Sequence, residues 1–361
     1  MKILVTGGCG FVGASLCLRL RAESPAHEVT ALDNHRRRGS ETNRAELERV
    51  GVRVVHGDVR LPSDIAALGP CDWIIDAAAE PSVLAGTGTT ARHATRCQLV
   101  EHNLVGTINL LEAAAGRGAG VVILSTSRVY SIPALAALPL VEETAADAPA
   151  YRIDDARPLP AAASVRGIAE PFTTAAPVSL YGATKLASEL LAQEYACATG
   201  TPLIIDRCGV MAGAGQFGRA DQGIFSWWIH SWAAGRPLSY IGFGGRGLQV
   251  RDCLHPADLG ELLVRQMKVA RGGVPELHNV SGGAGSATSL AQLSAWCAGR
   301  FGPQAVGSAP DDRPYDVPWV VLDHGAATRK YGWTPARDRE SVFEEIADHA
   351  LRHPHWLETC G

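Results

Sequence analysis

Short apolar segments alternate with segments of helix length along the first two thirds of the chain, and this alternation limits the possible folds most strongly. The apolar segments read as strands at Lys2–Thr6, Glu28–Asp33, Val52–Gly57, Trp73–Ala77, Val121–Ser125 and Pro202–Arg207. Strands that are apolar on both faces are typical of a parallel sheet covered by helices on each side. The pattern therefore predicts stacked βαβ units and a doubly wound parallel sheet of the α/β class.

The pattern of apolar residues and glycines changes after the sixth strand. Two convincing helices, Gln98–Ala115 and Leu180–Ala198, precede this change, with leucine and alanine at helical spacing. Beyond it come Gly-rich turns and short strands near Leu238–Ile241 and Leu248–Arg251. We predict a sheet domain over residues 1–210 and a smaller mixed α/β lobe over 211–361, with some of the chain crossing back to the sheet.

A Pro- and Ala-rich insertion separates the fifth strand from the next helix, over residues 131–178. Loops of this length inside a compact domain are uncommon and usually have a function. We expect the insertion to act as a lid or as a wall of the active site.

The composition excludes several classes of protein. A net charge of −4 and a pI near 6.3 give no electrostatic reason to expect nucleic acid or an anionic membrane as partner. The nine cysteines form no C-x-x-C pair, which argues against a zinc knuckle or a disulfide framework. The sequence lacks a leader pattern and a membrane-length apolar run. We expect a cytoplasmic protein without a metal.

A glycine-rich turn directly follows the first strand. The segment Thr6-Gly7-Gly8-Cys9-Gly10-Phe11-Val12-Gly13 opens a helix and places glycines at 7, 10 and 13. Glycine allows the tight turn and a close backbone approach, and the helix N-terminus offers unpaired N–H groups to a pyrophosphate. In this position, after a strand and before a helix, the turn indicates a dinucleotide-binding (Rossmann) sheet rather than a purely structural loop.

An acidic residue ends the second strand, where it can accept hydrogen bonds from the adenosine ribose. Asp33 in this position favours NAD over NADP, because it repels a 2′-phosphate. The arginines at 36–38 leave NADP as the alternative. The predicted cofactor contacts are Gly7, Gly10, Phe11, Val12, Gly13, Asp33, Asn34, Arg37, Asp58, Val59, Ala77, Ala78, Ala79, Ser125, Tyr181 and Lys185.

A Y-x-x-x-K motif places Tyr181 and Lys185 on one face of a helix. A nearby ammonium and the cationic nicotinamide favour the phenolate, so the tyrosine can act as general base toward a sugar hydroxyl. Thr126 ends the fifth strand at the carboxyl edge of the sheet, where open α/β sheets bind ligands. The three residues together predict a hydride-transfer site.

With these motifs, the chain resembles the extended short-chain dehydrogenase/reductases that act on nucleotide sugars, over essentially its whole length. The resemblance implies that Thr126, Tyr181 and Lys185 are catalytic and that Asn103 lies near the cofactor. It also implies a homodimer, formed by the helices that carry Asn103 and Lys185. The alternative is that the apolar stripes of these helices pack only inside the subunit.

Within that family, residues 216–223 and 249–255 look most like the CDP-sugar 2-epimerases. The resemblance implies that Arg251 and Arg313 hold the diphosphate of a nucleotide sugar. The implied substrate contacts are Glu80, Ser82, Thr126, Gln216, Phe217, Asp221, Gln222, Gln249, Arg251 and Arg313. Glu80 departs from the pattern, since the 2-epimerases carry an amide there.

The residues after Thr126 bear on the reaction type. Dehydratases of the family carry Asp-Glu at this point, whereas this chain has Ser127-Arg128, so epimerisation with NAD is favoured. A nucleotide-sugar 4-epimerase, a reductase or dehydratase of the same family, and a dinucleotide-binding protein without catalysis remain alternatives. The tryptophans at 227, 228 and 232 are more typical of a core than of a base-stacking site.

Overall fold

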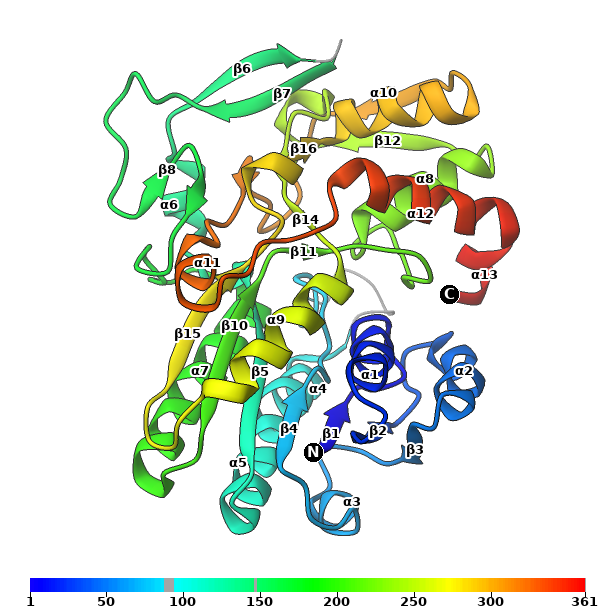
Figure 1. Cartoon of the computed structure of the whole chain (residues 1–361). Coiled ribbons are helices and arrows are strands. Elements are labelled where there is room, and N and C mark those ends of the chain that lie inside the picture. The colour runs from blue at the N-terminus through cyan, green and yellow to red at the C-terminus, as the bar shows by residue number, and fades with distance from the viewer. Residues whose placement is uncertain (88–93, 146–147, 361) are drawn as a thin grey trace.

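The central sheet is parallel and has seven strands, in the order β15-β10-β5-β4-β1-β2-β3 (Figure 1). The computed structural model describes residues 1–87, 94–145 and 148–360. The strands are β1 Lys2–Thr6, β2 Glu28–Asp33, β3 Arg53–His56, β4 Trp73–Asp76, β5 Gly120–Thr126, β10 Leu203–Cys208 and β15 Glu276–Val280. The doubly wound parallel sheet is therefore confirmed, and the six predicted strands agree with the observed ones to within one residue at each end.

The seventh strand, β15, was not predicted from the sequence. It pairs with β10 at the edge of the sheet, with Asp206 opposite His278 and Arg207 opposite Asn279. Both β15 residues are buried although they are polar. Hydrophobic periodicity does not detect a strand whose buried positions are filled by polar side chains.

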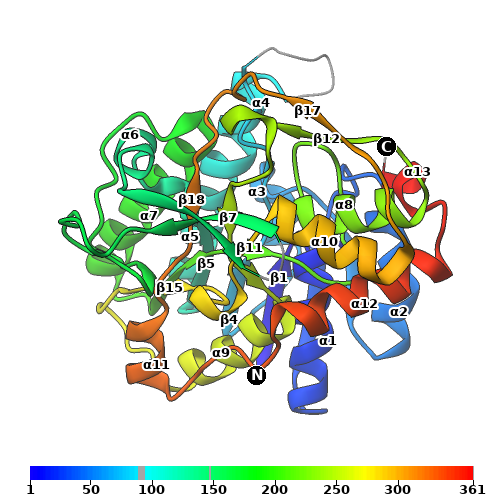
Figure 2. The same ribbon diagram turned by 90° about the horizontal axis from the view of Figure 1, so that it is seen from above.

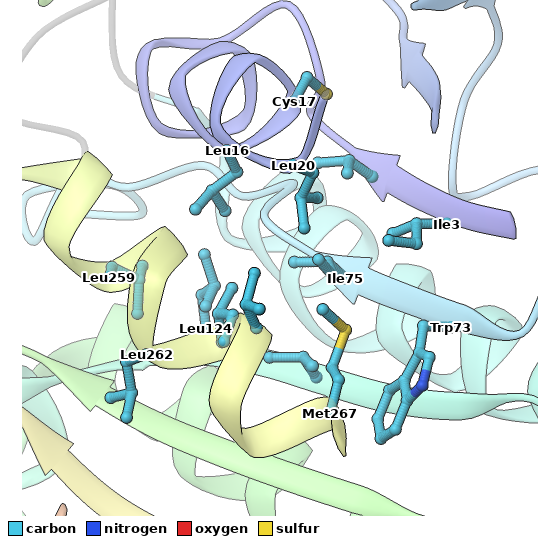
Figure 3. Packing of buried hydrophobic residues seen from close by; sticks show 14 of the residues in the cluster. Ile3, Leu16, Cys17, Leu20, Trp73, Ile75, Leu124, Leu259, Leu262 and Met267 are labelled. Carbon is cyan, nitrogen blue, oxygen red and sulfur yellow. The ribbon is translucent and has the colours of Figure 1, made fainter. Parts of the chain in front are cut away.

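Helices cover both faces of the sheet, as the apolar strands require. On one face α1 (Phe11–Glu23) and α9 (Pro256–Val269) pack against alternate strand residues such as Ile3 and Ile75 (Figure 3). On the other face α5 (Gly106–Arg117) and α7 (Ser179–Thr199) bury the opposite set, including Leu4. The helix before α5 begins as α4 (Arg96–Val100) and passes through a π-helical segment, Glu101–Val105.

The remaining elements are short or belong to the C-terminal lobe. The helices are α2 Arg44–Arg49, α3 Pro62–Ala66, α6 Ile132–Ala136, α8 Ile224–Ala233, α10 Leu290–Phe301, α11 Gly325–Tyr331, α12 Arg339–Arg352 and α13 Trp356–Cys360. The strands are β6 Leu140–Ala145, β7 Ala148–Ile153, β8 Ala163–Ser164, β9 Gly167–Ile168, β11 Val210–Met211, β12 Leu238–Ile241, β13 Val250–Arg251, β14 Cys253–Leu254, β16 Thr288–Ser289, β17 Val306–Ala309 and β18 Trp319–Val320.

The C-terminal lobe lies beyond the carboxyl ends of the strands (Figures 1 and 2). Helices α8, α10 and α12 enclose its core, where Trp228 and Trp232 are almost fully buried. The expected core role of these two tryptophans is therefore confirmed. After the first part of the lobe, the chain returns to the sheet through α9, β15 and α11. The division into a cofactor-binding part before residue 210 and a substrate-binding part after it stays a prediction.

The insertion 131–178 packs beside the site rather than forming its wall. Its apolar residues share a core with the segment 317–322 and with Val250. Ile168 exchanges backbone hydrogen bonds with this segment, from its amide to Val321 and from Asp323 to its carbonyl. Within its described part, 131–145 and 148–178, no residue lines either cavity described below. The expectation of an active-site wall is not met, and the lid role stays a prediction.

Among the described residues, no helix is long and apolar enough to cross a membrane.

Candidate active site

A cavity of about 550 Å³ opens at the carboxyl ends of β1, β2, β4 and β5. It lies where the strand order reverses between β1 and β4, the place where open α/β sheets bind ligands. Nearly all residues predicted to contact a cofactor line it, namely Gly7, Gly10, Phe11, Val12, Gly13, Asp33, Asn34, Arg37, Val59, Ala77, Ala78, Ala79, Ser125, Tyr181 and Lys185. We call it the dinucleotide cavity.

The glycine turn brings three backbone segments into close contact. Gly7 has a φ of 59°, a left-handed conformation that favours glycine. A Cβ on Gly13 would lie 2.1 Å from the carbonyl oxygen of Gly7, so no larger residue fits there. The N-cap of α1, Gly10, has no side-chain cap. The first N–H groups of α1 are therefore available to a pyrophosphate.

Asp33 stands beside this turn as predicted. Its carboxylate accepts hydrogen bonds from the backbone amides of Cys9, at 2.9 Å, and His35, at 2.8 Å. A carboxylate has about four acceptor positions, so capacity remains for ribose hydroxyls. Asp58 lies outside the cavity wall, and its carboxylate accepts a hydrogen bond from the side-chain amide of Asn34 at 3.0 Å. Asp58 therefore acts through Asn34 in this structure.

Asn103 also lies outside the cavity wall, in the π-helical segment, and is fully buried. Its side chain accepts a hydrogen bond from the amide of Glu80, at 2.8 Å, and donates one to the carbonyl of Glu80, at 3.1 Å. Glu80 lines the dinucleotide cavity. Asn103 therefore holds the loop that follows β4 in place, a contact that no sequence pattern predicts.

Thr126, Tyr181 and Lys185 converge on the same cavity from β5 and α7. The Lys185 ammonium is buried and donates to the Leu124 carbonyl at 3.1 Å. The Thr126 hydroxyl accepts a hydrogen bond from the Arg128 amide at 3.2 Å. The i, i+4 spacing on α7 thus places both predicted side chains at the end of β5, as expected.

The surroundings of Tyr181 act on the pKa of its phenol in both directions. Burial raises the pKa of Tyr181 to about 12, although a hydrogen bond with Thr126 and the positive charge of Arg128 act to lower it. The Lys185 ammonium donates its hydrogen bond to the Leu124 carbonyl of β5. Further positive charge beside the phenol is needed to make it a base near neutral pH.

A second cavity, of about 270 Å³, adjoins the first and is formed largely by the C-terminal lobe. Thr126, Tyr181 and Gln222 line both cavities. The other predicted substrate residues in this wall are Asp221, Gln249, Arg251 and Arg313. We call it the substrate cavity. The shared residues place a reacting group of one ligand next to the other.

Three predicted substrate residues line only the dinucleotide cavity, and one lines neither cavity. Glu80, Gln216 and Phe217 belong to the first group. Ser82 lines neither cavity and donates a hydrogen bond to the Asp221 carboxylate at 2.8 Å. Ser82 therefore positions Asp221.

The C-terminal segment packs against the loop of residues 216–223. The sequence alone did not reveal these contacts. Trp356 stacks on Phe217 and donates from its indole nitrogen to the carbonyl of Gln216, at 2.9 Å. Arg37 donates to the carbonyl of Phe217, and Arg219 donates to the carbonyl of Cys360. These contacts join residues at both ends of the chain, so no local sequence signal marks them.

The sequence prediction also missed several wall residues. Arg128, Asp316 and Trp227 line the substrate cavity, and Arg219 lines the dinucleotide cavity. Trp227 follows the core pattern of α8, yet it faces a cavity that several distant segments enclose. Arginine, aspartate and tryptophan also occur on ordinary protein surfaces and in ordinary cores. Residue type alone therefore did not mark these positions as cavity residues.

Comparisons with known proteins show which enzymes this chain is similar to. The curated CDP-paratose 2-epimerase of Salmonella typhi is 28% identical over 72% of this chain and 72% of its own. The dTDP-L-rhamnose 4-epimerase of Burkholderia thailandensis is 30% identical over 96% of this chain and 93% of its own. A double mutant of dTDP-glucose 4,6-dehydratase from Streptomyces venezuelae, solved with NAD, is 25% identical with a TM-score of 0.78, and covers 100% of both chains.

The family model described as "NAD dependent epimerase/dehydratase family" matches residues 3–281. This stretch contains the glycine turn, Asp33, and Thr126, Tyr181 and Gln222, which line both cavities. NAD is the dinucleotide of the family, in agreement with the expectation from Asp33. The chain belongs to the NAD-dependent epimerase/dehydratase family of enzymes that act on nucleotide sugars.

Proposed function

We propose that this protein is a nucleotide-sugar epimerase that inverts carbon 2 of a CDP-linked sugar. The observation that carries the proposal is that the two cavities meet at Thr126 and Tyr181. One cavity has the glycine turn and Asp33, and the other has Arg251 and Arg313, whose guanidinium groups suit a diphosphate. A sugar hydroxyl between them has a base on one side and a hydride acceptor on the other.

NAD bound in the dinucleotide cavity would supply the acceptor and donor of hydride for the sugar carbon. Tyr181 removes the hydroxyl proton during oxidation and gives it back when the sugar is reduced. Thr126 donates a hydrogen bond to the reacting oxygen, because its own oxygen already accepts the Arg128 amide. Lys185 contributes a fixed positive charge from α7. The sugar turns between the two transfers, so that the hydride returns to the other face.

The residues after Thr126 support epimerisation over loss of water. Elimination requires a further acid and base next to the reacting carbon. Ser127 and Arg128 occupy the turn that follows Thr126, and Arg128 is a cation. Epimerisation uses only the residues already placed at the junction of the cavities.

Carbon 4 is the second candidate for the reacting centre. The relative that acts as a dTDP-L-rhamnose 4-epimerase covers more of this chain than the 2-epimerase relative does. The same Thr126, Tyr181 and Lys185 would serve that reaction, so the difference lies in how the sugar is placed.

Deuterium at a single sugar carbon tests the reaction directly. The purified holoenzyme is incubated with CDP-glucose labelled at carbon 2 or at carbon 4, and with UDP, GDP and dTDP analogues. The product sugars are analysed by nuclear magnetic resonance, and the dinucleotide is analysed by mass spectrometry. We expect inversion at carbon 2 with the deuterium returned to that carbon of the product, and a slower reaction with the carbon-2 label than with the carbon-4 label, because only the C–H bond that is oxidised is broken. Loss of water, net reduction by added NADPH, or inversion at carbon 4 alone would overturn the proposal.

We also propose that the chain forms a homodimer in the cytoplasm through the helices that carry Asn103 and Lys185. Two exposed apolar residues support this interface, Val105 next to α5 and Leu190 on α7. Light scattering after size-exclusion chromatography should give the mass of two chains. A Leu190→Glu variant should give the mass of one chain, and a wild-type protein that elutes as a monomer would contradict the dimer.

A further inference from the structure

Arg128 lies two residues after Thr126 in the sequence, and it also lines the substrate cavity. It belongs to the 3₁₀ turn Ser127–Val129, which Thr126 caps by accepting the Arg128 amide. A Cβ on Gly182 would lie 2.2 Å from the Arg128 carbonyl oxygen, so α7 and this turn touch next to Tyr181. The backbone of Arg128 is therefore held at the reacting centre.

The guanidinium of Arg128 is anchored by a neutral group. It donates to the carbonyl of Tyr315 at 3.0 Å, and Tyr315 has a positive φ of 62°, unusual for a residue with a side chain. Burial, together with the positive charge of Arg251, lowers the pKa of Arg128 to about 10, while Asp316 acts to raise it. Arg128 is thus protonated at neutral pH.

Arg251 stands nearby but is already paired. Its guanidinium donates to the Asp316 carboxylate at 2.6 Å and to the Val317 carbonyl at 2.8 Å. The two arginines and this one carboxylate line the substrate cavity together with Tyr181, and Arg128 is close enough to Arg251, Asp316 and Tyr181 to interact with their charges. One positive charge is therefore left uncompensated by Asp316 next to the catalytic phenol, which suits an anionic group of the substrate.

The phosphate attached to the sugar is the anionic group nearest to the reacting atoms in a nucleotide sugar. It is bonded through the anomeric oxygen, so the hydroxyl on carbon 2 is the ring hydroxyl next to it, and carbon 4 lies across the ring. A cation that touches both the Tyr181 region and this phosphate would bring carbon 2 to the phenol.

We propose that Arg128, with Arg251, binds the sugar-linked phosphate and thereby presents the carbon-2 hydroxyl to Thr126 and Tyr181. Arg128 is then a specificity-determining residue, which selects the carbon that is oxidised. This assignment rests on the proposed function, because it takes a nucleoside diphosphate sugar as the ligand of the substrate cavity.

Binding of CDP and CMP to the NAD-loaded protein tests the role of Arg128. The sugar-linked phosphate is present in CDP and absent in CMP. In Arg128→Met we expect CDP affinity, measured by calorimetry, to fall about 10- to 100-fold, since a charge-assisted hydrogen bond is lost. CMP affinity should stay unchanged. An Arg128→Lys variant keeps the charge without the fork, so its loss should be intermediate, and it replaces Arg128→Met if that variant does not fold.

Arg166→Met is the matched control, because the Arg166 side chain is 74% exposed and its ion pair with Asp323 lies away from both cavities. It should leave both affinities unchanged. Equal weakening of CDP and CMP in the Arg128 variants, or no weakening of CDP, would overturn the assignment. If the wild type prefers UDP, the pair UDP and UMP takes the place of CDP and CMP.

The deuterium experiment separates the two proposals. A slower reaction of the wild type with the carbon-4 label than with the carbon-2 label overturns the 2-epimerase proposal, whatever Arg128 binds. With carbon 2 confirmed in the wild type, Arg128→Met should lower the rate of carbon-2 oxidation at least as strongly as it lowers CDP affinity. An unchanged rate at saturating substrate and unchanged CDP affinity would leave Arg128 a purely structural residue.

Discussion

A buried ion pair joins β10 to α7, the helix that carries Tyr181 and Lys185, and its removal should be costly. The side chains of Glu189 and Arg207 are only 2% and 7% exposed. Arg207 Nη2 lies 2.6 Å from Glu189 Oε2, and its Nε donates to both carboxylate oxygens at 3.1 and 3.2 Å. Ser125 also donates to this carboxylate. Glu189 is one helical turn beyond Lys185, so the pair positions the helix that carries the Y-x-x-x-K motif.

Replacing Glu189 with glutamine keeps the shape of the side chain and leaves Arg207 charged and buried without a counter-charge. Breaking a buried pair in this way costs about 3–5 kcal/mol of unfolding free energy. Since the amide oxygen still accepts one hydrogen bond, we expect about 3 kcal/mol for Glu189→Gln. The double variant Glu189→Met with Arg207→Met removes both charges. Its loss of unfolding free energy should be smaller than the sum of the losses of the single variants Glu189→Met and Arg207→Met, by at least about 2 kcal/mol.

Urea unfolding at a fixed concentration of NAD measures these free energies, because bound cofactor shifts the apparent stability. Glu344→Gln is the control, since its pair with Arg300 lies on the surface with side chains 51% and 32% exposed. We expect it to cost less than about 1 kcal/mol. A loss below about 1 kcal/mol for Glu189→Gln, or single losses that simply add in the double variant, would refute the reasoning.

Three further predictions concern the glycine turn, the catalytic phenol and a buried acid. Gly13→Ala should abolish bound dinucleotide, measured by mass spectrometry after denaturation, because the new Cβ would lie 2.1 Å from the Gly7 carbonyl oxygen. Tyr181→Phe should lower turnover about 10²- to 10⁴-fold in initial-rate assays while NAD content stays the same. Burial raises the pKa of Asp206 to about 7, so the folded state holds a proton that the unfolded chain releases near pH 4. Stability from this group should therefore fall as the pH rises from about 4 to 7, and Asp206→Asn should remove that slope in urea unfolding.

Matched variants control these three tests. Gly116→Ala should keep its dinucleotide, because no atom lies within 4 Å of a Cβ there. Dinucleotide retained by Gly13→Ala would contradict the close-approach argument. Tyr195→Phe should keep full turnover, and equal losses in both tyrosine variants would argue against a special role for Tyr181. Asp348→Asn changes an exposed carboxylate and should leave the pH slope of the wild type in place. The same slope in Asp206→Asn would show that another group causes it.

The sequence alone determined the features that depend on local chemistry. Apolar runs define strands such as Lys2–Thr6 because a strand buried on both faces must be apolar along its length. The turn after it is recognisable because only glycine tolerates the backbone approach seen at Gly13. The spacing of Tyr181 and Lys185 likewise predicts a shared helix face, because four residues make about one helical turn.

Only the tertiary structure decided which distant residues complete the site. Strand β15 joins the sheet with buried polar residues such as His278 and Asn279, so hydrophobic periodicity gives no signal there. Asn103 holds Glu80, and Tyr315 anchors Arg128, through contacts between segments far apart in the chain. Such contacts depend on how packed elements meet, and residue type alone does not determine that meeting. The sequence therefore predicts Thr126 and Tyr181, at which the two cavities meet. Only the fold determines which charged side chains surround these two residues.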